Sequence, residues 1–121
     1  MRIGIAAVLL VAMVAPAFPH HSAAAEFDVN NPIALDGVIT KLEWTNPHAH
    51  LYMDVTDAGG KVNNWNLELA SPNMLSRNGW SRNSLKAGDK VSVTGLKAKD
   101  SSNAAYANSI TFPDGRKLAP R

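Results

Sequence analysis

One stretch decides how this chain folds: Trp44-Thr45-Asn46-Pro47-His48-Ala49-His50. It closes one apolar, β-rich run and opens another run that carries two histidines, two residues apart. Pro47 cannot donate a hydrogen bond to a strand ladder, and it restricts Asn46 to extended conformations. We therefore expect a turn at Asn46-Pro47 with a strand on either side.

The run before the turn alternates from Ile33 onward. One face carries Val38, Thr40, Leu42 and Trp44, and the other carries Ile39, Lys41 and Glu43. Alternation of this kind is typical of a half-buried strand.

Two further strands follow the turn, and their apolar residues fix the register. The apolar face holds Ala49, Leu51, Met53 and Val55 in the second strand, from His48 to Asp57, and Trp65, Leu67 and Leu69 in the third. Both apolar faces stay together only if Met53 lies opposite Trp65, because a slip of one residue turns every side chain over. This register predicts a three-residue loop with glycine in the left-handed position.

The rest of the chain supplies a short helix and two more strands. Ser71-Pro72 is a good helix start and Asn78-Gly79 a good helix end, so we expect a helix of about two turns between them. Met74, Leu75 and Trp80 are expected to plug the open end of the barrel, and further strands begin near Val91 and Tyr106.

The order of three strands, a helix and two strands predicts an all-β domain with one short helix. It is the order of the small five-stranded oligonucleotide/oligosaccharide-binding (OB) barrel, βββαββ, here over residues 33–121. A five-stranded sandwich of another connectivity is the structural alternative.

The beginning of the chain has the pattern of a secretory signal peptide. Arg2 precedes an apolar run from Ile3 to Val14, and Ala15-Pro16-Ala17 follows as a cleavage signal. A retained membrane anchor is the alternative, but the run is shorter than the about 20 residues of a membrane helix. We expect residues 1–17 to be removed, residues 18–32 to form a flexible arm, and the mature protein to be periplasmic or secreted with no membrane span.

Charge and cysteine content narrow the function classes. The formal charge of the whole chain is +2, and it falls to +1 without Arg2. The basic residues are scattered among acids, which argues against a nucleic-acid partner. The chain has no cysteine, so no disulfide stabilises the fold.

His48 and His50 lie on one face because side chains alternate along a strand. An imidazole pair suits copper, zinc or nickel. The register sets Glu68 opposite His50, as a carboxylate ligand or as a partner that fixes the tautomer of the imidazole. Two plainer interpretations stay open: His48 hydrogen-bonds the turn, and His50 is a solvated strand residue paired with Glu68.

His20 and His21 extend the metal hypothesis to the arm. Cleavage after Ala17 would put His20 third from a free amine, but a square-planar copper site there needs an N–H that Pro19 lacks. A histidine brace would need later trimming to make His20 the first residue. A four-histidine site that joins the arm to the barrel remains open, and a disordered arm is the plain alternative.

Enzyme hypotheses find little support. The serines lack the nucleophile-elbow glycine pattern, and Gly59-Gly60 joins two strands rather than cradling a phosphate. Asp54 and Glu68 would be about 13 Å apart along the strands, which is wider than a glycosidase pair. We therefore expect a binding protein and not an enzyme.

The second function class is a metal-independent binding module. OB barrels bind ligands on the face of their second and third strands. Beside the two histidines and Glu68, that face carries Tyr52, Asn64 and Asn66. This polar face suits a glycan, a peptide or an envelope protein partner better than single-stranded nucleic acid, which needs several stacking aromatics. A structural envelope protein without a small ligand is a third possibility.

Short blocks along the whole expected mature chain resemble a family of small exported bacterial proteins of unknown function. The blocks are His20-His21-Ser22, Glu26-Phe27-Asp28, Gly37, Trp44 to His48, Glu68, Ser71-Pro72-Asn73, Gly79-Trp80, Leu85 to Asp89 and Pro113 to Arg116. The resemblance implies export and one small β-domain, and it implies no mechanism. Relatives commonly carry an aromatic residue where His50 stands and another where Ala23 stands, so a metal site built on His50 would belong to this protein rather than to the family.

Overall fold

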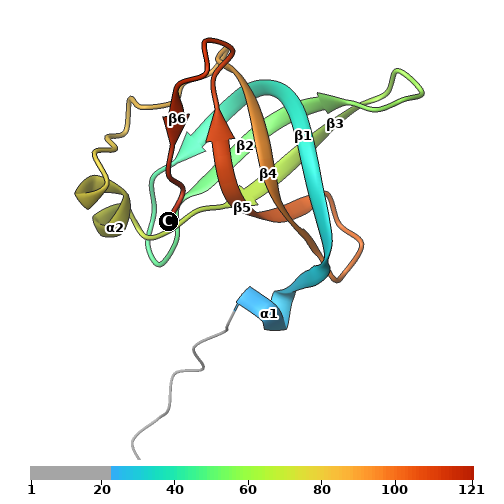
Figure 1. The fold of residues 1–121 in the computed structure, drawn as a ribbon, viewed down its shortest axis with the longest axis horizontal. Coiled ribbons are helices and arrows are strands. Elements are labelled where there is room, and N and C mark those ends of the chain that lie inside the picture. The colour runs from blue at the N-terminus through green and yellow to red at the C-terminus, as the bar shows by residue number, and fades with distance from the viewer. Residues whose placement is uncertain (1–22) are drawn as a thin grey trace, which may run out of the picture.

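The computed structural model describes residues 23–121 (Figure 1). The signal-peptide prediction, most of the arm and the pair His20-His21 lie outside these residues. The elements are α1 (Ala23–Glu26), β1 (Phe27–Glu43), β2 (His50–Thr56), β3 (Val62–Glu68), α2 (Pro72–Arg77), β4 (Lys90–Ala98), β5 (Ala104–Thr111) and β6 (Lys117–Leu118).

The strands form one sheet that closes on itself. Its order is β3-β2-β1-β4-β5-β6, and an additional pairing joins β3 to β5. Five strands therefore form a ring, with the antiparallel pairs completed by the parallel pair β3–β5. The predicted small all-β barrel, with a short helix between its third and fourth strands, is confirmed. The two-residue β6, which pairs with the end of β5, was not predicted.

β1 is longer than predicted and begins within the expected arm. The sequence placed the arm at residues 18–32 and the barrel from Ile33, but β1 starts at Phe27 and α1 precedes it. Phe27 is buried, packs against the ring of Tyr106 and pairs with Ala98 of β4. After Phe27, pairing with β4 resumes only at Pro32. Residues 28–31 do not show the alternation of apolar and polar side chains by which a strand is predicted. Residues 27–32 thus belong to the barrel.

A bulge in β1 changes which side chains face the core. Ile39 pairs with Met53 and Lys41 with Tyr52, so Thr40 is an extra residue in the ladder. The sequence grouped Val38 with the later apolar positions of the strand, but Val38 is 38% exposed and Ile39 only 1%. The inserted residue reverses the parity at this point.

The β2–β3 hairpin has the predicted register and loop. Met53 lies opposite Trp65, and the Asp57 amide donates to the carbonyl of Lys61, which leaves a three-residue loop. Gly60 has φ +82°, the left-handed conformation expected of glycine there.

Asp57 stabilises this loop through its carboxylate. One oxygen accepts from the backbone amides of Lys61 and Gly59, and the other accepts from the side chain of Asn63. These bonds favour the charged form, so the backbone bond from Lys61, then Asn63 and Gly59, lower the pKa of Asp57.

One end of the barrel is closed by α2 and the last residues of the chain. Ser71 caps the helix by accepting from the Met74 amide, as predicted. Leu75 and Trp80 are buried against the core, and the Trp80 indole donates to the carbonyl of Ala119. Met74 was wrongly predicted to join this plug: it is 44% exposed. In the described part of the chain, neither helix has the length and apolar character needed to span a bilayer.

Candidate functional site

The polar face of β2 and β3 has the cross-strand pairs that the register predicts. Glu68 lies opposite His50, and Asn66 lies opposite Tyr52. Because β2 and β3 alternate regularly, these side chains share one face of the sheet.

Hydrogen bonds on this face run diagonally rather than straight across. His48 Nδ1 lies 2.5 Å from Glu68 Oε1, and His50 Nδ1 lies 2.8 Å from Asn66 Oδ1. The sequence predicted that Glu68 contacts His50, its partner in the register. In the structure Glu68 contacts His48 instead, two residues earlier in the chain. Strand twist brings diagonal neighbours within reach of long side chains, and position alone does not choose between them.

The two contacts favour one tautomer of each neutral imidazole. With Glu68 as an ionised carboxylate and the oxygen of Asn66 toward the ring, each Nδ1 carries the hydrogen of its bond. In its neutral form each ring then keeps a lone pair on Nε2, because the single N–H is on Nδ1. The His48 side chain is 45% exposed and that of Glu68 only 14%, so the carboxylate anchors an accessible ring.

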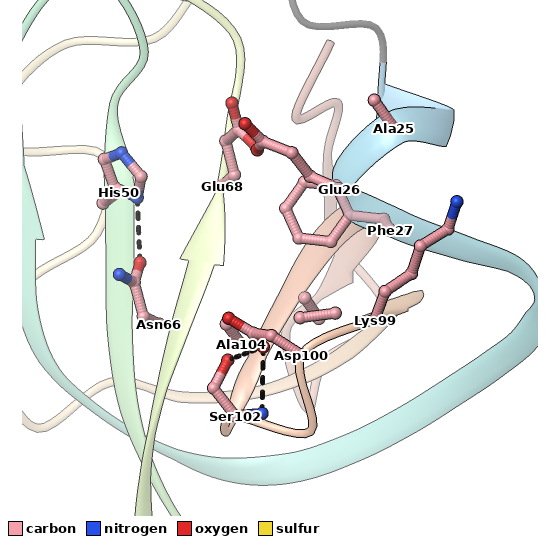
Figure 2. Close-up of a pocket in the computed structure, with 12 residues that line it drawn as sticks. Ala25, Glu26, Phe27, His50, Asn66, Glu68, Lys99, Asp100, Ser102 and Ala104 are labelled. Carbon is pink, nitrogen blue, oxygen red and sulfur yellow. Dashed lines mark hydrogen bonds between the residues drawn. The ribbon is translucent and has the colours of Figure 1, made fainter.

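A cavity of about 590 Å³ opens beside these residues (Figure 2). It lies between α1, the start of β1, strands β2 and β3, the end of β4, the β4–β5 loop and the start of β5. Its lining residues are Ala25, Glu26, Phe27, His50, Asn66, Glu68, Ala98, Lys99, Asp100, Ser102, Ala104 and Ala105. The volume is in the usual range for small-molecule sites.

Three residues of the predicted ligand face lie outside the cavity lining: His48, Tyr52 and Asn64. Tyr52 is covered by the ammonium of Lys41, 5.6 Å from its ring centre. Asn64 donates to Asp54 and to Thr40. The predicted face is therefore divided between a cavity at the His50 end and a hydrogen-bonded surface toward the hairpin.

Arg121 is a neighbour of the site that the sequence did not indicate. Its Nη2 donates to the Glu68 carbonyl and its Nε to the Ala107 carbonyl, while the guanidinium lies against the ring of Tyr106. Burial lowers the pKa of Arg121, and Tyr106 and Glu68 oppose part of this effect. The end of the chain thus fixes the backbone of Glu68 through contacts between elements far apart in sequence.

The metal hypothesis names five residues, of which the structure describes three. His48, His50 and Glu68 lie on one face, whereas His20 and His21 lie outside the described residues. Within residues 23–121, no three or more histidine, aspartate or glutamate side chains are grouped as a metal site. Any further ligand must therefore come from elsewhere in the chain or from solvent.

These features define a small all-β barrel with a polar cavity beside the face of its second and third strands. The chain belongs to a family of unknown function, DUF6152, whose model matches residues 7–107. No curated protein and no solved structure matches the chain.

Proposed function

We propose that this protein is an exported binding domain that holds a transition-metal ion, copper or zinc, through His48 and His50. The observation that carries the proposal is the hydrogen bonding of the two rings: both Nδ1 atoms face oxygen acceptors. Both Nε2 atoms are then available as metal ligands. A carboxylate on the far nitrogen is the usual support of a metal-bound histidine.

Glu68 has the supporting role in this proposal, and Asn66 has the same role for His50. The described residues supply two imidazoles, so the coordination shell needs further ligands. His20 and His21 are suitable candidates, because Ala25 and Glu26, a few residues further along the chain, line the same cavity as His50 and Glu68.

Titration calorimetry with Cu²⁺ and Zn²⁺ tests the proposal. We expect sub-micromolar binding by the wild type. His48→Ala and His50→Ala should each lower the affinity by at least about 100-fold, because each removes a direct ligand. Asp114→Asn, in the turn before β6, is the control and should bind as the wild type does. A wild-type dissociation constant above about 100 µM, or about 5.5 kcal/mol, contradicts the proposal.

The same titration on a variant with both His20 and His21 changed to alanine assigns the remaining ligands. Weaker binding places ligands on the arm, and unchanged binding leaves the coordination to the barrel face and solvent. The periplasmic or secreted location rests on the leader-like sequence of residues 1–17, and cell fractionation with mass analysis of the purified protein tests it.

A second function is favoured by the cavity itself: metal-independent binding of a glycan, a peptide or an envelope protein partner. It calls for a polar concave surface on the face of β2 and β3, where His50, Asn66 and Glu68 line the cavity. Binding that persists in the presence of a chelator distinguishes it from the metal proposal. Both functions are binding rather than catalysis, with no nucleic-acid partner.

A further inference from the structure

The cavity beside His50 has an unbalanced set of charges. Three carboxylates line it from three parts of the fold: Glu26 from α1, Glu68 from the end of β3 and Asp100 from the β4–β5 loop. Lys99 is the one lysine or arginine among the lining residues, which also include His50. The Lys99 ammonium donates to the carbonyl of Ala24, which holds it on α1. Glu68 is in contact with His48, and Glu26 and Asp100 are the other two acids. The lining therefore favours a positively charged ligand.

Asp100 is held in place as a carboxylate. Its Oδ1 accepts from the hydroxyl and from the amide of Ser102, at 2.5 and 3.0 Å. These bonds, the hydroxyl first, lower the pKa of Asp100. The loop thus presents a fixed negative charge to the cavity, opposite the residues of β2 and β3.

An aromatic ring completes the wall. Phe27 lines the cavity together with Glu26, Glu68 and Asp100, and Figure 2 shows its ring beside the side chain of Glu26. Packing against Tyr106 fixes this ring in place. Aromatic rings attract organic cations, and carboxylates accept charge-assisted hydrogen bonds from ammonium groups.

The three carboxylates of this wall do not form a metal site of their own. The carboxylates and His50 do not group as three or more ligands around a point in the described residues. A volume of about 590 Å³ has room for a small organic molecule. An anion would face three carboxylates.

We infer that the cavity binds a small organic cation that carries one or two ammonium groups, with its carbon chain on Phe27 and its charge toward Glu26 and Asp100. This inference names the ligand chemistry of the cavity and does not depend on the metal proposal.

The test uses chelator-treated, metal-free protein, so that its outcome is separate from that of the metal titration. The probes are 1,4-diaminobutane and 1,4-butanediol, which has nearly the same shape and no charge, each followed by ¹H–¹⁵N NMR. We expect saturable shifts at the amides around the cavity with the diamine, with a dissociation constant of about 1 mM or lower. Nα-acetyl-lysine methylamide is titrated in parallel, because a protein lysine carries the same ammonium group.

Three variants test the assigned contacts. Glu26→Gln and Asp100→Asn keep the size of each side chain and remove its charge, and Asn at position 100 can still accept from Ser102. Phe27→Leu removes the aromatic face and keeps an apolar side chain. We expect each to weaken diamine binding by about 2- to 5-fold, with Asp114→Asn as the charge-matched control outside the cavity.

Binding of the diamine alone would identify a free organic cation as the ligand of the cavity. Comparable binding of the lysine derivative would show that the cavity also accepts a lysine side chain of a protein. Equal binding of the diol and the diamine would overturn the inference. So would the absence of saturable shifts, or variants that all bind as the control does.

Discussion

Gly37 of β1 lies so close to β2 that it leaves no room for a side chain. A Cβ added there would collide with the backbone carbonyl of Asp54 and would lie 2.8 Å from Cε of Met53. Met53 is fully buried, so it cannot withdraw without opening the core. We expect Gly37→Ala to destabilise the fold by about 2–3 kcal/mol, as overpacked core positions do.

Urea unfolding followed by circular dichroism measures this effect. For a domain of this size the expected loss corresponds to a fall in melting temperature of about 10–20 °C. Gly59→Ala is the matched control in the β2–β3 loop, since a Cβ there meets only Asp57 Oδ1, at an ordinary 3.4 Å. A Gly37→Ala protein within about 0.5 kcal/mol of the wild type and of this control would refute the close approach of β1 and β2.

Three more predictions concern the plug, the loop and the site. Trp80→Phe removes the indole donor to the last residues of the chain and should cost about 1 kcal/mol in urea unfolding; an unchanged midpoint would contradict that bond. Asp57 has a pKa lowered first by the backbone bond from Lys61, so its stabilisation is present above its unfolded-state pKa and is lost as pH falls through the lower folded-state value. Asp57→Asn should therefore lose less stability than the wild type on acidification. If the free energies of unfolding of the two proteins fell in parallel with pH, the prediction would be wrong. Glu68→Gln replaces the carboxylate that holds Nδ1 of His48 and should reduce metal affinity by about 10- to 100-fold in calorimetry. An affinity equal to that of the wild type would show that Glu68 has no role in metal binding.

The parts of the fold that depend on alternation were predictable from the sequence. Met53 and Trp65 can share an apolar face in one register only, and glycine at position 60 fits the loop that this register leaves. The start of α2 was predictable in the same way, because the N-cap Ser71 and the first helical residue Pro72 are adjacent in the sequence. In each case the deciding interaction is local or follows from strand parity.

The missed features depend on curvature and on distant contacts. The extra residue at Thr40 lets β1 bend from one neighbour to the other, and the sequence around it alternates as if the strand were regular. Phe27 joins the barrel by packing on Tyr106, which is remote in sequence. Arg121 reaches Glu68 only because the chain end folds back over the barrel.

The candidate site was predicted at the level of its face and not of its contacts. Strand parity placed His50, Asn66 and Glu68 together, which the register confirms. The diagonal choice of partners follows from twist, and the cavity depends on Glu26 and Asp100, which come from α1 and the β4–β5 loop. No local pattern in the sequence links these two residues to the strands.

The central claim is that His48 and His50 present unprotonated Nε2 atoms to a metal ion. Long-range ¹H–¹⁵N NMR of the imidazole nitrogens measures this directly, in the metal-free protein and after addition of Zn²⁺. We predict the Nδ1–H tautomer for both neutral rings, and a shift of both Nε2 resonances when zinc binds. Nε2–H tautomers, or Nε2 resonances that zinc leaves unchanged, would contradict the claim.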